Sequence, residues 1–356
     1  MIASRTRSGK TALPKQPAGR WTRLLSVFQK TTLYLSVTFL FFLSACGGGP
    51  DVSQSTGHGI LLATSQGVFN ISFSSNGSST LTSTTPVIAG SINAMVTVEN
   101  ASYPIIGPML VTTDGTTLTA YPMTGGVPAA TGDPISPSCT LPTLSSIASL
   151  SVTPDGKYLL VTTSGSNTLS IIHLANGYSC TQTSINSGYP TSVSVECLQI
   201  GSSCQIFLTL SSSASNNTPV PPGVISWTEG PTLSATSTSL TGLKPASSAI
   251  FDNETSYFYA LVASNNSRVY NVSGVNTLSS SSKYNNTSTS YGNVPFSNPC
   301  LDPLGQTLYA PTYNNGSVYS ASVSTSGSIG SPQRIWSLTS NPSGVQISPI
   351  TSCAAY

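Results

Sequence analysis

Few side chains in this sequence could carry out acid–base or metal chemistry. The 310 residues after position 46 (356 − 46) contain two His, five Lys or Arg, and ten Asp or Glu. Four of the acids come at the ends of short predicted strands that would lie nearest the axis of the fold: Glu99, Glu196, Asp252 and Glu254. Because such chemistry requires several titratable groups to converge, these four are our candidates for an axial carboxylate cluster.

The other titratable residues have simpler explanations. Asp114 and Asp155 precede Gly, and Asp302 precedes Pro, so each fits a turn. His173 lies within the apolar segment LSIIHL, where a core position is expected, and His58 lies in a polar tether. No G-x-S-x-G, H-E-x-x-H, P-loop or EF-hand pattern is present. Outside the four-acid cluster, the sequence predicts no catalytic residue, no metal site and no cofactor.

The N-terminal segment has the features of an export signal. Its first 45 residues contain seven of the 12 Lys and Arg and no Asp or Glu, and residues 33–43 are largely apolar. The following Leu43-Ser44-Ala45-Cys46 resembles the lipobox of bacterial lipoproteins. That resemblance implies cleavage before Cys46 and attachment of a lipid to its sulfur. An uncleaved membrane helix is the alternative, but a span needs about 20 apolar residues and this stretch is shorter.

The lipobox divides the sequence into three predicted parts. They are a signal peptide at residues 1–45, a flexible tether at 46–57, and a folded domain at 58–356. We expect the lipid to hold the exported protein at the cell envelope. In Gram-negative lipoproteins an Asp after the lipidated cysteine tends to retain the protein at the inner membrane. Gly47 therefore implies the periplasmic face or the surface of the outer membrane, if the source is Gram-negative.

The charge that remains after the leader excludes one class of partner. Five basic and ten acidic residues give the remainder a net charge of −5. Nucleic acid binding depends on clustered Lys and Arg, which this part of the chain lacks. We therefore expect no nucleic acid partner.

The six cysteines after Cys46 predict disulfides, as expected for an exported chain in an oxidising compartment. Cys197 and Cys204 flank a Gly-Ser turn between two strand-like pieces, so we expect them to pair across a hairpin. Order along the chain suggests two further pairs, Cys139 with Cys180 and Cys300 with Cys353, among about 15 possible pairings. A zinc site is the alternative, but no pair has C-x₂₋₄-C spacing.

A repeat of about 50 residues sets the predicted fold. Six segments each contain an apolar strand, a turn rich in Gly, Ser and Asn, and a second strand. They begin at Ile60, Met109, Tyr158, Gln205, Tyr257 and Thr307, which are 49, 49, 47, 52 and 50 residues apart. Short strands at this period are typical of propeller blades. The sequence therefore predicts an all-β protein, a β-propeller with six blades.

Additional strand-like pieces would complete the blades. Five of them precede a repeat and would be inner strands: 92–100, 147–157, 191–200, 247–254 and 297–305. The first repeat follows only the tether, whereas residues 341–356 resemble the start of another blade. We expect this C-terminal strand to pair with the strand from Ile60 and close the ring, which removes open edges. Seven blades are the alternative if 205–257 or the C-terminal segment contains another blade.

The third repeat resembles one family of propellers. Val152-Thr153-Pro154-Asp155-Gly156-Lys157-Tyr158-Leu159-Leu160-Val161, followed by Gly165-Ser166-Asn167-Thr168-Leu169-Ser170-Ile171, is similar to the blade repeat of YVTN and lactonase-like propellers. The match covers one blade. It implies the propeller fold and, by analogy with lactonase-like members, acidic groups and sometimes a metal at the mouth of the axis.

Two functions fit these patterns. The loops are rich in Ser, Thr, Asn, Gly and Tyr, which suits adaptable hydrogen bonding by a non-catalytic module that binds or scaffolds a protein or an envelope polymer. The alternative is a lactonase-like hydrolase that uses the axial carboxylates. Tyrosines concentrate in the last two repeats, where they could pack between blades or recognise carbohydrate or peptide: Tyr257, Tyr259, Tyr270, Tyr284, Tyr291, Tyr309, Tyr313 and Tyr319.

Overall fold

Each of the six repeats forms the central hairpin of one antiparallel sheet. We analysed a computed structural model of the chain. It describes residues 59–73, 79–101, 107–142, 147–197, 203–215, 218–228, 237–252, 257–262, 267–272, 288–292, 296–313, 315–337, 347 and 349–356. These belong to one unit, Thr56–Tyr356. Cys46, His58 and Glu254 lie outside the described residues, as do the predicted signal peptide and the tether.

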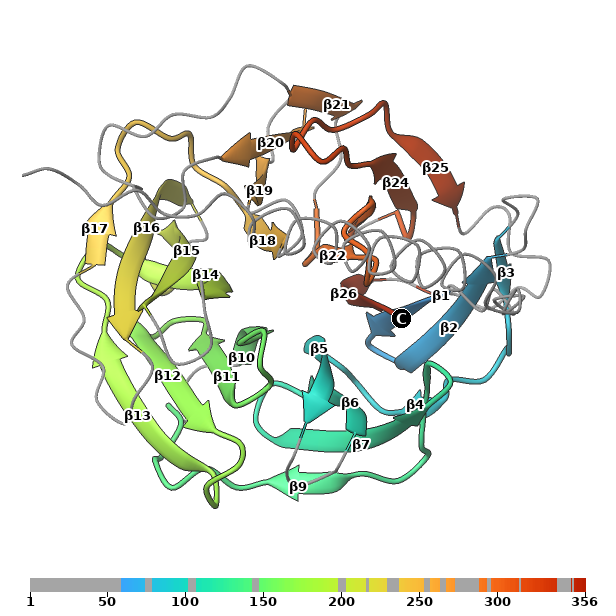
Figure 1. The fold of residues 1–356 in the computed structure, drawn as a ribbon, viewed down its shortest axis with the longest axis horizontal. Helices are drawn as coiled ribbons and strands as arrows, with labels where there is room; N and C mark the ends of the chain where they lie inside the picture. Colours follow the sequence, from blue (N-terminus) through green and yellow to red (C-terminus); the bar gives the residue numbers. More distant parts are fainter. Residues whose placement is uncertain are drawn as a thin grey trace, which may run out of the picture. The chain divides into compact units, whose positions relative to one another are not determined.

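The sheets surround one axis, as Figure 1 shows. The strands next to the axis are β26 (Ile350–Ala355), β5 (Ala94–Ala101), β10 (Ile147–Val152), β14 (Tyr189–Cys197), β18 (Ser248–Asp252) and β22 (Cys300–Leu301). Each contacts the next around the ring, and β22 contacts β26. The prediction of six blades is confirmed.

The other strands lie progressively farther from the axis. The second strands are β1 (Gly59–Thr64), β6 (Gly107–Thr113), β11 (Tyr158–Thr163), β15 (Ser203–Ser211), β19 (Tyr257–Val262) and β23 (Thr307–Pro311). The third strands are β2 (Gly67–Phe73), β7 (Leu118–Thr124), β12 (Thr168–His173), β16 (Pro219–Thr228), β20 (Ser267–Val272) and β24 (Val318–Ser322). The outer strands are β3 (Ser79–Leu81), β4 (Ile88–Ala89), β8 (Val127–Pro128), β9 (Asp133–Ile135), β13 (Ser179–Ser184), β17 (Ser237–Ser239), β21 (Ser288–Gly292) and β25 (Gln333–Trp336).

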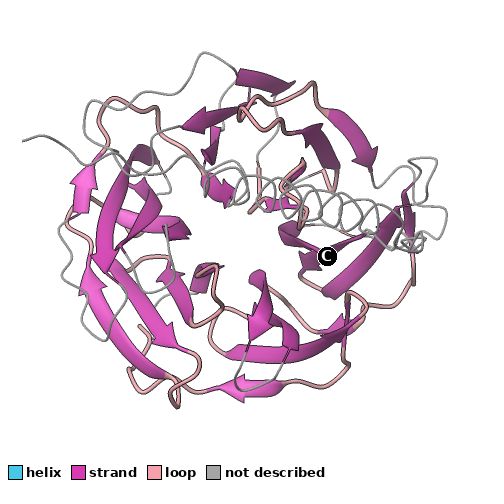
Figure 2. Cartoon of the chain, in the orientation of Figure 1, coloured by secondary structure: helices cyan, strands magenta, loops and turns pink. Residues whose placement is uncertain are grey.

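The described residues form strands and turns without a helix (Figure 2). Within this part of the chain, no helical segment has the length and apolar character needed to cross a membrane.

The ring is closed by strand exchange, as the sequence predicts. β26 pairs with β1 in antiparallel register, with Leu62 opposite Cys353. Beyond this strand, the hydroxyl of Tyr356 donates to Oδ1 of Asn70 at 2.7 Å, and its backbone N–H donates to the carbonyl of Gly59. The Tyr356 ring also covers Gly126, where a Cβ atom would overlap the ring. Side-chain and backbone contacts therefore reinforce the strand pairing.

The apolar core lies between neighbouring blades. The second strands are buried on both faces because each blade is covered on both sides, and Ile60, Leu61 and Leu62 are fully buried in sequence. Six apolar clusters fill the six spaces between blades. In one of them Tyr158 meets Trp227 edge-on at 5.1 Å. This explains why the second strands have continuous rather than alternating apolar residues.

Three disulfides join the pairs expected from the sequence: Cys139–Cys180, Cys197–Cys204 and Cys300–Cys353. Cys197 and Cys204 face each other across the β14–β15 hairpin. Cys300–Cys353 joins β22 to β26, and therefore joins the last blade to the first.

Candidate axial binding site

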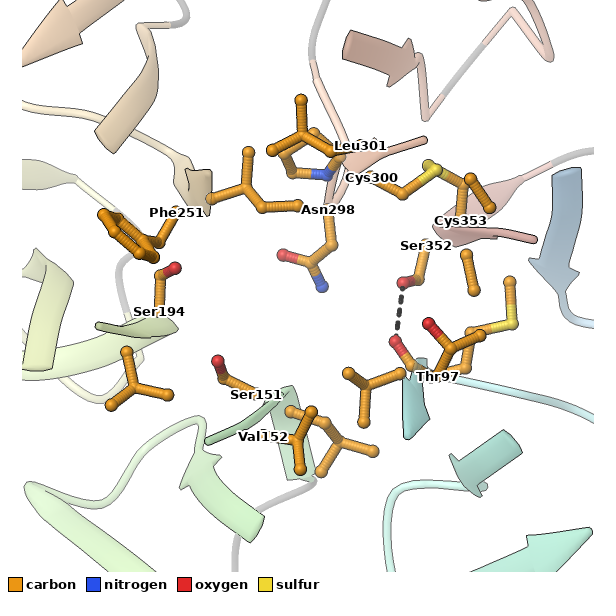
Figure 3. Close-up of a pocket in the computed structure, with 18 of the residues that line it drawn as sticks. Thr97, Ser151, Val152, Ser194, Phe251, Asn298, Cys300, Leu301, Ser352 and Cys353 are labelled. Atoms are coloured by element: carbon orange, nitrogen blue, oxygen red, sulfur yellow. Dashed lines mark hydrogen bonds between the residues drawn. A yellow bond between two sulfur atoms is a disulfide. The ribbon is translucent and has the colours of Figure 1, made fainter. Parts of the chain in front are cut away.

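A cavity of about 320 Å³ lies on the axis and is lined by the inner strand of every blade. Each inner strand pairs with its second strand on one side and turns its other edge toward the axis. Figure 3 shows the side chains that surround the cavity; those labelled are Thr97, Ser151, Val152, Ser194, Phe251, Asn298, Cys300, Leu301, Ser352 and Cys353. The site is therefore built from small polar and apolar side chains together with strand edges, which can donate and accept hydrogen bonds.

One side chain crosses the axis. Asn298 lies two residues before β22, and its side chain points toward the centre of the cavity (Figure 3). Its Nδ2 donates to the backbone carbonyl of Ala148 at 3.3 Å. Ala148 belongs to β10, which is three blades away in the ring of six blades. Asn298 thus links opposite blades, and it lines both the axial cavity and a second opening on the axis.

Hydrogen bonds join successive blades around the axis, mostly through Ser and Thr hydroxyls. They run from Ser297 Oγ to Ile350 O, Ser352 Oγ to Met95 O at 3.5 Å, Ile147 N to Gly115 O at 2.7 Å, Val193 N to Ser149 Oγ at 3.3 Å, Thr209 Oγ1 to Ser247 O at 3.4 Å, and Ser248 Oγ to Ser297 O at 3.1 Å. The bond from Ser352 is drawn in Figure 3. We call the five of these contacts that involve a hydroxyl the hydroxyl belt. The belt gives Ser and Thr residues in or near the inner strands a structural role that sequence patterns do not reveal.

The structure brings only part of the predicted carboxylate cluster to the cavity. Glu99 is exposed and lines the cavity, and Asp252 lines it although only 2% of its surface is exposed. Glu196 is 4% exposed but is not among the residues that line the cavity. It lies opposite Gln205 in the β14–β15 register. Glu254 lies outside the described residues, so the structure places two of the four acids at the site.

Glu196 is nevertheless an unusual group. Burial raises the pKa of Glu196 to about 7, because a low-dielectric surrounding disfavours the charged form. Its Oε2 has no hydrogen-bond partner among the described residues. A carboxyl group in this state is close to half protonated at neutral pH and is costly to ionise.

The acids assigned to turns do stabilise turns. Asp302 lines the cavity, but its Oδ1 accepts the backbone N–H groups of Gln306 and Thr307 at 2.6 and 2.9 Å. Burial opposes ionisation of Asp114, but hydrogen bonds from Thr117 and Thr116 outweigh it and lower the pKa of Asp114. These carboxylates are already engaged by the protein.

Asp155 and His173 also have local partners. Burial again opposes ionisation of Asp155, yet bonds from Lys157 and Thr153 lower its pKa, and Lys157 Nζ lies 2.6 Å from its Oδ2. His173 is half-buried, and its ring stacks on Tyr158 with centroids 4.7 Å apart. Among the described residues, no group of three or more His, Cys, Asp or Glu is arranged to hold a metal ion. The arrangement around the axis therefore favours hydrogen bonding over acid–base chemistry.

Comparison with known proteins supports the fold. No protein-family model matches the chain, and no curated protein matches its sequence. A putative 6-phosphogluconolactonase from Bacteroides uniformis is similar in structure, with a TM-score of 0.50, 11% identity, and coverage of 85% of this chain and 100% of that one. A chain of a nidogen/laminin complex gives a TM-score of 0.50 and 11% identity, covering 84% of this chain and 98% of that one.

A hydrazine synthase from Kuenenia stuttgartiensis is also similar, with a TM-score of 0.45 and 11% identity over 67% of this chain. That match spans 64% of the synthase chain, which is less than two thirds of its length. Identities this low are informative about fold alone. Together with the six sheets and the exchanged strand, the likenesses at a TM-score of 0.50 show that the chain folds as a β-propeller.

Proposed function

We propose that this chain is a lipid-anchored envelope propeller that binds or scaffolds a protein or an envelope polymer without catalysing a reaction. The observation that carries the proposal is the lining of the axial cavity. Its labelled polar side chains are the hydroxyls of Thr97, Ser151, Ser194 and Ser352 and the amide of Asn298. Such groups recognise a partner by hydrogen bonding and remain uncharged at physiological pH.

The size of the cavity favours a partner that inserts only a small part of itself. Its volume of about 320 Å³ is near the lower end of the range for ligand pockets, about 300–1,000 Å³. A loop tip or a few polymer units would occupy it, while the turns around the mouth contact the remainder. Glu99, at the rim, would favour a neutral or basic group over an acidic one.

Photo-cross-linking in intact envelopes tests this proposal. A photoreactive amino acid at Thr97 is expected to capture a partner, whereas the same group at the exposed Gln333 of outer strand β25 is the matched control. Capture at Thr97 alone supports the axial site. Equal capture, or none, at both positions contradicts it.

The anchor is a separate part of the proposal. The lipobox at Leu43–Cys46 supports lipid attachment, and three disulfides support export to an oxidising compartment. Fatty-acid labelling of the wild type should be lost in Cys46→Ala, and the unlabelled variant should leave the membrane fraction. Equal labelling of both proteins would reject the anchor without affecting the binding proposal.

A lactonase-like hydrolase is the second candidate, favoured by Glu99 and Asp252 in the lining of the axial cavity and by the pKa of Glu196 near 7. A carboxyl group with such a pKa can give and accept a proton near neutral pH. A panel of lactones incubated with the wild type provides the test. Turnover that disappears in Glu196→Gln or Asp252→Asn, while both variants remain folded, would overturn the non-catalytic proposal.

A further inference from the structure

A second opening lies at the end of the axis where the inner strands begin. It has a volume of about 290 Å³ and includes Ser248, Phe296, Ser297, Asn298, Tyr313 and Thr351. We call this opening the neutral mouth. Ser248 begins β18, whereas Asp252 ends the same strand at the axial cavity. The neutral mouth and the acidic side of the axial cavity are therefore at opposite ends of the inner strands.

No charged side chain lines the neutral mouth among the residues that the structure describes. The neighbouring undescribed stretches 143–146, 293–295, 314 and 348 contain no acidic or basic residue either. An anionic or cationic ligand would lose its hydration here without gaining a counter-charge, which is costly. The lining thus favours an uncharged ligand.

The side-chain hydroxyls of residues that line the mouth donate to backbone carbonyls, and Ser248 and Ser297 are only 2% and 7% exposed. Ser248 Oγ donates to the carbonyl of Ser297 at 3.1 Å, and Ser297 Oγ donates to the carbonyl of Ile350. Thr351 Oγ1 donates to the carbonyl of Ile92 at 2.7 Å. Because each hydroxyl hydrogen is used within the protein, the acceptor lone pairs are what these groups can offer a ligand. The fitting ligand carries several O–H donors close together.

An aromatic ring stands at the rim of the same mouth. Tyr313 is 46% exposed and is the only aromatic residue among the exposed large apolar side chains of the described residues. Its neighbour Thr312 bridges to Phe296, which packs edge-on against Tyr291 at 5.2 Å. The backbone beside Tyr313 is therefore held in place. An exposed ring offers a flat apolar surface with a polar tip, which suits a ligand that has both C–H and O–H faces.

We propose that the neutral mouth binds an uncharged carbohydrate, with one sugar ring against Tyr313 and its hydroxyls directed to the partly exposed Thr351 and Asn298 amide. A sugar ring presents several O–H donors around an apolar C–H face. An extended peptide presents its N–H groups about 3.3 Å apart along one line, with alternate groups pointing away. The partly exposed acceptors at the mouth, Thr351 and Asn298, come from different blades and not from one strand, which matches the sugar better. This site adjoins the axial cavity and shares Asn298 with it, but its ligand chemistry does not depend on the function proposed for that cavity.

Titration of the detergent-solubilised full-length protein with cellobiose, maltose and chitobiose tests the proposal, followed by saturation-transfer NMR. At least one of these sugars is expected to bind, and more tightly than glucuronate or glucosamine. Tyr313→Ala should weaken binding about tenfold, whereas Tyr313→Phe should retain it because the ring is kept. Leu304→Ala is the matched control, since Leu304 is also exposed but lies in the turn after β22, at the other end of the axis.

Three results would overturn the proposal. The first is that none of the three sugars binds the wild type at about 50 mM. The second is that Tyr313→Ala binds as the wild type does while its circular dichroism and melting temperature confirm the fold. The third is that Na⁺ or K⁺ displaces the sugar, since that would identify the acceptor ring as a cation site.

Discussion

The two ends of the propeller axis are built from the same inner strands but differ in chemistry. The axial cavity extends along the inner strands to the ends where Glu99 and Asp252 lie, and Cys300 and Cys353, which form a disulfide, also line it. At the neutral mouth the strands begin, and uncharged hydroxyls bond to carbonyls of neighbouring blades. All inner strands run in the same direction along the axis. Residue types that recur at the starts of these strands, or at their ends, therefore lie together around the axis. The acids and the covalent link between the first and last blades therefore line the axial cavity, whereas the hydroxyl contacts extend from the neutral mouth into that cavity.

The largest expected effect is the loss of stability when the disulfide between the first and last blades is removed. Cys300→Ser with Cys353→Ser should lower the free energy of unfolding by about 4 kcal/mol, because the disulfide closes a loop of 53 residues. Cys197→Ser with Cys204→Ser is the control; it opens a loop of 7 residues and should cost about 2 kcal/mol. Urea denaturation measures both. Equal losses would show that joining the blades adds nothing beyond local restraint.

The next effect is a pH dependence of the free energy of unfolding, which we assign to Glu196 near the end of β14. The pKa of Glu196 is about 7 in the folded protein and 4.5 ordinarily, so the folded state binds more protons between these values. Stability should therefore fall as pH rises from about 4.5 to 7 and stay lower above that range, a loss of about 3 kcal/mol.

Denaturation at several pH values compares the wild type with Glu196→Gln. The substitution should remove most of this fall. Glu99→Gln, at an exposed acid of the same end, is the matched control and should leave the profile as it is. A fall of the same size in Glu196→Gln would assign the dependence to another group.

A smaller effect is expected at the neutral mouth. Ser297→Ala removes the hydroxyl that donates to Ile350 O and should cost about 1–2 kcal/mol, because a buried carbonyl loses its donor. Ser151→Ala is the control, since Ser151 is half-buried at the surface of the axial cavity and water can replace its bonds. We expect a change within about 0.5 kcal/mol there. Similar values from urea denaturation would contradict the structural role of the hydroxyl belt.

The smallest effect is expected where the two ends meet. Asn298→Ala removes the bond across the axis to Ala148 O, and it should cost less than about 1 kcal/mol because both openings admit water. The melting temperature measures this change. If Asn298→Ala lowers stability more than Ser297→Ala does, the Asn298 bond makes a main contribution to the stability of the ring, which contradicts this expectation.

Features that repeat along the chain could be predicted from the sequence. The six apolar pieces that begin at or near Ile60, Met109, Tyr158, Gln205, Tyr257 and Thr307 all become second strands. The exchanged strand follows from the missing inner strand before Ile60, and the Cys197–Cys204 pair follows from its short turn. Each of these depends on local pattern or on chain order, which a sequence displays directly.

The chemistry on the axis could be predicted only in part. Asn298 reaches Ala148 across 150 residues of sequence, and no local pattern indicates that contact. Glu196 lies next to the end of an inner strand as expected, but its side chain is buried and does not line the cavity. Tyrosines show the same limit: Tyr259 in the fifth repeat is buried between blades, whereas Tyr313 in the sixth is exposed. Burial at these positions is decided by the neighbouring blade.

The exchanged strand also imposes an order on assembly. Chain synthesis delivers β1 first among the described strands and β26 last, so the first blade is the last to be completed. Until β26 is made, β1 has an open edge that can pair with another chain, and Cys300 lacks its partner thiol. An unfinished molecule is thus marked by a free sulfhydryl and an unpaired edge, two signals that a quality-control system could read.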